Sequence, residues 1–186
     1  MFKKLNFTKS IINNQYLIIS SGVIFIITGI SYFTVSNIHV CLFLTGLSFM
    51  ISSLLNIIFF FKNRYTIEGW GFYLVFLMIV LNGGLYFLLN TEAGITLGIG
   101  IICLFNLFIF LGFMIDLKKY AFSNSNLLIT VNIIIIIFSI ILLIKSPSTL
   151  STAINIILVG SNFIFLDFEL KKLKKRYAYI KQLTKI

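Results

Sequence analysis

The segment TGISYF at residues 28–33 and the segment NGGLYF at residues 82–87 share a pattern that decides the fold. Each has glycine in second place, closes on Tyr-Phe and stands near the end of a long apolar run. A third, weaker copy, FSIILL at residues 138–143, follows at nearly the same interval and has serine in second place. We interpret the three segments as marks of an internal repeat; the alternative is chance similarity between apolar runs.

The composition identifies the solvent of this chain. Only 11% of its 186 residues are charged and 59% are hydrophobic, whereas a soluble domain carries about a quarter of its residues charged. The surface cannot be covered with polar side chains, so lipid must be the solvent. A net charge of +10 would suggest nucleic-acid binding in a soluble protein. Here the cations flank apolar runs, which favours contact with anionic lipid and no nucleic-acid partner.

Six apolar runs are each close to the roughly 20 residues that a helix needs to cross a bilayer. They cover residues 16–35, 38–61, 70–89, 93–115, 127–144 and 150–170. The first run is full length and no small-residue cleavage site follows it, so we expect a retained helix and not a signal peptide. The sequence therefore predicts an all-α integral membrane protein with six transmembrane helices in a single membrane domain, residues 1–186.

The positions of the cationic residues predict the orientation in the membrane. If the N-terminus lies inside, every lysine and arginine except Lys145 falls on the cytoplasmic side. The positive-inside rule favours that arrangement, with both termini cytoplasmic. The Ile, Asn, Lys and Phe bias suggests the plasma membrane of a bacterium as the location. We expect the basic tail from Lys171 to Ile186 to contact anionic lipid headgroups as a basic surface helix; a plain positive-inside anchor is the alternative.

The repeat and the orientation together define a unit of two spans. Each unit is a helical hairpin with a tight outer turn and a basic inner end, and the three hairpins cover residues 16–64, 70–119 and 127–172. A unit with an even number of spans re-enters the membrane in the same orientation. The copies are therefore expected to be parallel repeats around an axis along the membrane normal.

Three longer segments carry a resemblance to a known family: GVIFIITGISYF at residues 22–33, NGGLYFLLNTEAGITLGIGI at 82–101 and IILLIKSPSTLSTAINIILVG at 140–160. Each places a small residue near the end of one span, then a turn, then a second span, with proline in one turn of the three. This pattern resembles the HdeD-type short-repeat membrane proteins of bacteria, although the third segment is poorer in glycine. The resemblance implies a six-helix inner-membrane protein with a role in acid resistance or envelope stress.

Small residues let helix backbones approach closely, so they mark helix–helix contacts in membranes. Gly94 and Gly98 form a G-x-x-x-G pair at the start of the fourth run. Gly29, Gly83 and Ser139 occupy equivalent positions just before the three outer turns. We interpret these five residues as packing positions within the chain, with a homo-oligomer contact as the alternative.

Four polar residues are candidates for an intramembrane cluster: Asn82, Asn106, Asn162 and Asp167. An amide in hydrocarbon needs a hydrogen-bond partner, so we interpret them first as interhelical hydrogen-bonding residues and second as a substrate site. Asn155 is a further amide deep in an apolar run. Lys171 follows Asp167 at the spacing of an ion pair along one helix face.

His39, the only histidine, stands at the outer start of the second run. An imidazole gains a proton in mildly acidic surroundings, so His39 is a candidate pH-responsive residue. The alternative is an ordinary polar residue in a turn.

The sequence carries no motif for a nucleophile, a metal site or a bound phosphate. One histidine and five carboxylates offer little for hydrolytic or metal chemistry. We therefore expect no enzymatic activity, no catalytic or metal-binding residues and no cofactor. The first hypothesis is a non-enzymatic inner-membrane protein in envelope stress or acid tolerance. The alternatives are a small transport or channel component, and a membrane protein of the bacteriocin-immunity type.

Overall fold

The computed structural model describes residues 14–67, 69–90, 96–118, 125–145 and 148–183. These residues form six α-helices: α1 (Tyr16–Thr34), α2 (Ile38–Lys62), α3 (Trp70–Leu89), α4 (Thr96–Lys118), α5 (Ser125–Lys145) and α6 (Thr149–Leu183). All six are long and apolar enough to cross a membrane. The prediction of six spans is confirmed, and the observed helix ends lie within three residues of the predicted ends except at the end of α6.

Local signals in the sequence start several of these helices. Asn37 caps α2, because its side-chain oxygen accepts a hydrogen bond from the backbone N–H of His39. Gly69 precedes α3 with a φ of +74°, a left-handed conformation that glycine adopts without steric cost. At the start of α6, the backbone N–H of Ser151 donates to Ser148 Oγ at 3.2 Å. These caps separate the spans where the apolar runs are interrupted.

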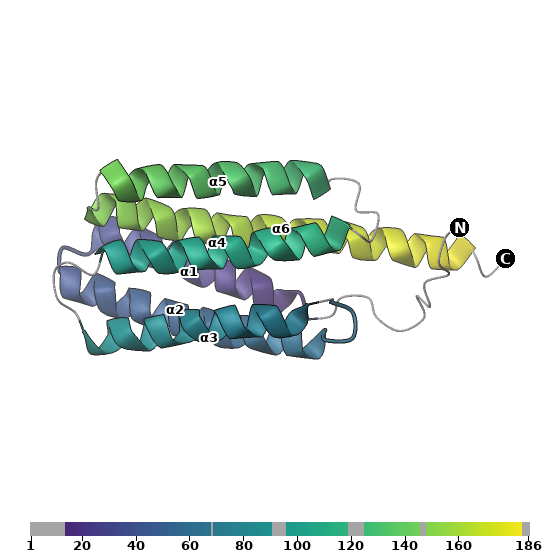
Figure 1. Cartoon of the computed structure of the whole chain (residues 1–186), viewed down its shortest axis with the longest axis horizontal. Helices are drawn as coiled ribbons and strands as arrows, with labels where there is room; N and C mark the ends of the chain where they lie inside the picture. Colours follow the sequence, from purple (N-terminus) through teal and green to yellow (C-terminus); the bar gives the residue numbers. More distant parts are fainter. Residues whose placement is uncertain (1–13, 68, 91–95, 119–124, 146–147, 184–186) are drawn as a thin grey trace.

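Five of the six helices form a closed ring. Going around it, α1 packs against α2, α2 against α3, α3 against α4, α4 against α6, and α6 against α1. The remaining helix, α5, lies outside this ring and packs only against α4 and α6 among the described helices. It runs along the upper edge of the molecule in Figure 1, and it has the smallest buried share of the six spans.

The strongest helix pairings join different predicted hairpins. The most extensive contacts are α1 with α6 and α2 with α3, whereas α3 with α4 and α5 with α6, the partners inside the second and third hairpins, pack much less extensively. The three predicted hairpins are therefore not three equivalent packing units. Interhelical packing in lipid depends on how closely surfaces fit, and the glycines described below create the closest fits between hairpins.

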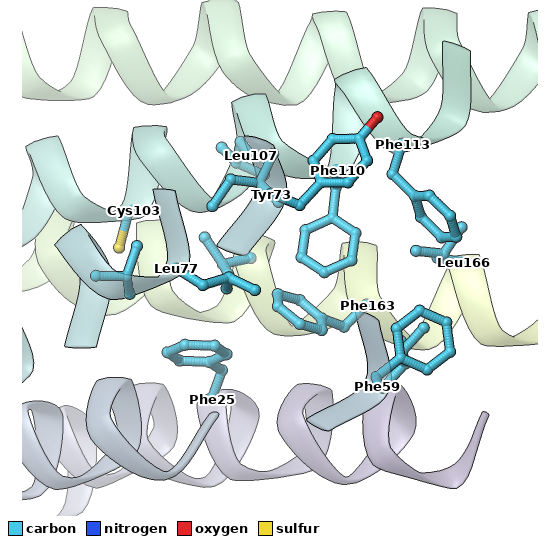
Figure 2. Packing of buried hydrophobic residues seen from close by; sticks show 14 of the residues in the cluster. Phe25, Phe59, Tyr73, Leu77, Cys103, Leu107, Phe110, Phe113, Phe163 and Leu166 are labelled. Atoms are coloured by element: carbon cyan, nitrogen blue, oxygen red, sulfur yellow. The ribbon is translucent and has the colours of Figure 1, made fainter. Parts of the chain in front are cut away.

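Aromatic side chains fill the centre of the ring. Phe25 of α1 lies 5.3 Å from Phe49 of α2 and 5.6 Å from Phe163 of α6, measured between ring centroids. Phe163 in turn lies 4.0 Å from Phe110 of α4. Figure 2 shows Phe25, Phe110 and Phe163 pointing inward from separate helices, with Leu77 of α3 beside them. The outer surface is also apolar, which suits contact with lipid.

The last helix is longer than its membrane span. The span of α6 ends at Lys172 and the helix continues to Leu183, which adds about 16 Å at about 1.5 Å per residue. Figure 1 shows this extension projecting beyond the other helices along the direction of α6. Lys171, Lys172 and Lys174 are exposed at its base, where cations suit the headgroup region.

Candidate functional site

The described carboxylates, Asp116, Asp167 and Glu169, lie at the end of the bundle that the sequence assigns to the cytoplasm. Asp116, near the end of α4, accepts a hydrogen bond from the hydroxyl of Tyr73 on α3 at 2.5 Å. Tyr73 is held in place by Phe60, whose ring centroid lies 4.9 Å away. The three-residue spacing of Asp116 and Lys119 predicts an ion pair along one helix face, but Lys119 lies outside the described residues. The Tyr73 contact joins residues 43 positions apart, and no local spacing signals it.

Asp167 is completely buried on α6, and it forms the ion pair that its spacing predicted. Lys171 Nζ lies 2.6 Å from Asp167 Oδ2, an ion pair by distance but without hydrogen-bond geometry. Lys172 and Glu169 form a second ion pair three residues apart. Since Lys171 is about half exposed, it can reach solvent while its amine remains near the buried carboxylate. Both pairs are local to α6 and involve no other predicted site residue.

One amide of the predicted intramembrane cluster lies apart from the buried ones. Asn82 lies exposed on α3, and its side-chain amide donates to the Met78 carbonyl of its own helix at 2.9 Å. Asn106 is buried on α4 and donates to the Ile102 carbonyl at 3.2 Å. Asn162 is buried on α6. The structure therefore does not bring Asn82 together with the buried members, because its side of α3 faces outward.

Two further buried amides were missed by the sequence reasoning. Asn56 of α2 and Asn132 of α5 are both completely buried, and neither side chain has a hydrogen-bond partner among the described residues. Asn132 begins the run NIIIII at residues 132–137, and a lone amide before five isoleucines was the available signal. Asn155, identified from its position in an apolar run, is buried as well.

His39 occupies the predicted position at the beginning of α2. It is exposed, at the end of the helix bundle opposite the described carboxylates. Its backbone N–H is used in the Asn37 cap, at 3.0 Å from the Asn37 side-chain oxygen. An exposed imidazole at this end is accessible from the outer side in the orientation that the lysines favour.

The glycines that precede the outer turns are packing positions, but they face different neighbours. A Cβ on Gly29 would collide with Ile157 of α6, and a Cβ on Gly83 would collide with Ile102 of α4. Ser139 is fully buried on α5. The three residues lie five or six positions before the ends of their helices, which agrees with the prediction of similar depth.

The predicted G-x-x-x-G pair does not form a close helix contact at the one residue that the structure describes. A Cβ on Gly98 would make an ordinary contact with Phe87 of α3, at 3.4 Å, while Gly94 lies outside the described residues. The closest backbone-to-backbone glycine contacts are two pairs that sequence reasoning did not identify, Gly22 with Gly160 and Gly46 with Gly84. Each pair comes from two different helices, so no sequence spacing predicts it.

The described residues contain no group of three His, Cys, Asp or Glu side chains that could hold a metal ion. Cys41 and Cys103 are both buried free thiols. The chain matches no protein-family model, no curated protein and no solved structure. What the fold establishes is the class: an all-α protein whose six helices are those of a multispan membrane protein.

Proposed function

We propose that this protein is a non-enzymatic, multi-pass protein of the bacterial plasma membrane that supports acid tolerance or envelope stress resistance. The observation that carries the proposal is the aromatic core: Phe25, Phe110 and Phe163 fill the ring that the helices enclose. A compact helical body of this kind acts through its surfaces in and beside the bilayer. The resemblance of the three repeated segments to HdeD-type proteins supports the same role.

Two exposed features are the points of action in this proposal. At the outer end, His39 is exposed and accessible to external acid. At the inner end, Lys171, Lys172 and Lys174 are exposed at the membrane boundary. Asp167 and Glu169 offset the charge of the first two, so Lys174 and the cations that follow it in the sequence supply the net attraction, about 1 kcal/mol for each cation near an anionic surface. The outer end senses acid and the inner end anchors the body to anionic lipid.

The test is survival of the source bacterium after acid challenge with the gene deleted and then restored. The deletion strain is expected to survive less well than the wild type, and the wild-type gene is expected to restore survival. A His39→Ala gene restores less if the imidazole senses external acid, while Asn82→Ala, an exposed polar position on another helix, serves as the matched control. Equal survival of the deletion strain and the wild type under acid and envelope stress contradicts the proposal.

A second candidate function is small-solute or ion transport, favoured by one observation. Asp167 is a carboxylate completely buried at the inner end of a span, and intramembrane ionisable groups mark ion paths in many transporters. Flux into vesicles that contain the purified protein, lost in Asp167→Asn, supports transport. The absence of flux for protons, Na⁺ and K⁺ argues for the first function, in which Asp167 serves the ion pair with Lys171.

A further inference from the structure

Four polar side chains are buried without hydrogen-bond partners where α5 meets the ring. They are Asn132 and Ser139 of α5 and Asn155 and Asn162 of α6, each at most 2% exposed. Neither the amide groups nor the serine hydroxyl have a hydrogen-bond partner among the described residues. We call these four residues the α5 seam. Only Asn162 belongs also to the cluster that the sequence predicted.

On α6, the two amides point away from α1. Gly160 and Ala153 contact α1, and at about 100° per residue Asn162 and Asn155 each lie about 200° around the helix from one of them. Phe163, next to Asn162, contacts Phe110 of α4. The only other described helix that packs on α6 is α5. Burial of the two amides is therefore due to α5 together with α4.

On α5, the buried residues form a single stripe. Leu128, Asn132, Ile136 and Ser139 recur at four- and three-residue intervals and so share one side of the helix. One turn further, Leu143 of α5 meets Gly100 of α4. Since α5 packs only against α4 and α6 among the described helices, this stripe fills the groove between them.

The polar residues of the two helices lie at matching depths. The number of residues from Asn132 to the end of α5 equals the number from the start of α6 to Asn162. Ser139 is likewise as far from the end of α5 as Asn155 is from the start of α6, and both lie closer to these ends than Asn132 and Asn162 do. Because α5 and α6 are antiparallel neighbours, Asn132 is level with Asn162, and Ser139 is level with Asn155. At about 1.5 Å per residue these levels lie about 20 Å and about 9 Å from the outer helix ends, well inside the bilayer.

Some other buried polar groups are satisfied within their own helices, whereas Ser52, Ser53 and Asn56 of α2 and the Asp167 carboxylate also lack hydrogen-bond partners among the described residues. Ser21 donates to the Leu17 carbonyl at 3.0 Å, and Asn106 donates to the Ile102 carbonyl at 3.2 Å. Buried polar groups in proteins are nearly always bonded, and water or a ligand is the usual partner when protein groups are not. The α5 seam gathers unused donors and acceptors at one interface, and α5 and α6 make the least extensive pairing of all packed helices here. A loose polar interface can admit a small molecule.

We propose that the α5 seam is a membrane-embedded binding site for small neutral molecules that both donate and accept hydrogen bonds, with water as the smallest. The chemistry of the seam selects this class. Its amides and hydroxyl offer donors and acceptors but no charge, and a charged ligand at this depth needs a countercharge that the seam does not provide. The site is separate from the proposed function, which does not depend on it.

The test is the reactivity of a cysteine placed in the seam of the full-length protein in vesicles. The background variant is Cys41→Ala with Cys103→Ala, which removes both native thiols. Ser139→Cys in this background is treated with methyl methanethiosulfonate, a small, neutral thiol reagent. The reagent reacts with thiolate, which forms only where water reaches the sulfur, so we expect labelling at least about tenfold faster than at a dry position.

Two positions serve as matched controls. Leu77→Cys lies in the aromatic core and is completely buried, and Ile134→Cys lies on the lipid-facing side of α5. Both are expected to react slowly, because packed side chains or lipid exclude the water that the thiol needs to form a thiolate. Acetamide, a neutral donor and acceptor, is expected to slow labelling of Ser139→Cys, whereas acetate at the same concentration is not.

A second variant tests whether the amides hold the ligand. Asn132→Leu with Asn162→Leu, added to Ser139→Cys, is expected to abolish fast labelling while helicity and elution in detergent stay unchanged. Labelling of Ser139→Cys as slow as at Leu77→Cys overturns the proposal and makes the seam a dry contact. Protection by acetate equal to that by acetamide overturns the assignment of a neutral ligand.

Discussion

Gly22 of α1 and Gly160 of α6 pack backbone against backbone. A Cβ built on Gly22 would lie 2.8 Å from the carbonyl oxygen of Gly160, and one built on Gly160 would lie 2.7 Å from the carbonyl oxygen of Gly22. Gly46 of α2 and Gly84 of α3 repeat the arrangement, with 2.9 Å between each hypothetical Cβ and the opposite carbonyl oxygen. These two crossings underlie the two most extensive helix pairings in the molecule.

Replacement of Gly160 by alanine is expected to destabilise the fold. The new methyl group meets backbone, which cannot rotate away, so α1 and α6 must separate at a cost of about 1–3 kcal/mol. The free energy of unfolding in detergent, followed by circular dichroism, measures the effect. Gly71→Ala is the matched control, because nothing lies within 4 Å of its Cβ position. A Gly160→Ala protein as stable as Gly71→Ala contradicts the close crossing.

The second crossing is expected to act independently of the first. Gly84→Ala meets the backbone of Gly46 and Met50, so it is expected to cost about as much as Gly160→Ala. The two crossings share no residue, and the double variant is expected to show the sum of the single losses within about 0.5 kcal/mol. A double variant no less stable than either single variant shows that the two crossings do not stabilise the fold separately.

Loss of the Tyr73 hydroxyl is expected to weaken the contact between α3 and α4. Tyr73→Phe keeps the ring among Phe60 and Phe113 but removes the 2.5 Å hydrogen bond to Asp116. Hydrogen bonds to charged groups contribute about 1.5–3 kcal/mol, so the free energy of unfolding is expected to fall by that amount in a denaturant titration. Tyr86→Phe, on the exposed side of the same helix, is the control and is expected to leave stability unchanged.

The aromatic core is expected to be intolerant of truncation. Phe163→Ala removes the contacts with Phe25 and Phe110 and leaves a cavity in the ring, at a cost of about 3 kcal/mol or more. Phe108→Ala, on the half-exposed surface of α4, replaces ring contacts that lipid can supply. The difference in unfolding free energy between the two variants measures packing. Equal losses contradict a core at the ring centre.

The orientation can be tested by reporter fusions. A fluorescent protein that folds only in the cytoplasm, fused after Ile186, is expected to fluoresce, because the cations of the tail keep that end inside. A periplasm-active phosphatase inserted after Lys145 is expected to be active. Substitution of the tail lysines by glutamine is expected to reduce the fraction in this orientation. An inactive phosphatase with a dark C-terminal reporter reverses the assignment.

The spans were predictable because lipid imposes a length and a composition on each helix, and both can be found in the sequence. A helix needs about 20 apolar residues to cross the bilayer, so composition alone located six helices nearly to their ends. The Asp167–Lys171 pair was predictable as well, since both residues belong to one helix at a fixed spacing. Equivalent depth of Gly29 and Gly83 followed from the repeat in the same way.

Contacts between helices depended on the tertiary structure. In lipid, most apolar helix surfaces are equally satisfied by lipid tails, so hydropathy carries little information on which helices meet. The sequence by itself determined the six spans and the clustering of cationic residues beside them. Only the folded chain decided that Gly22 meets Gly160 and that Asn82 faces outward. It also decided that Asn132 of the peripheral α5 lies level with Asn162 of α6. Close packing, which is a property of two surfaces together, decided these contacts.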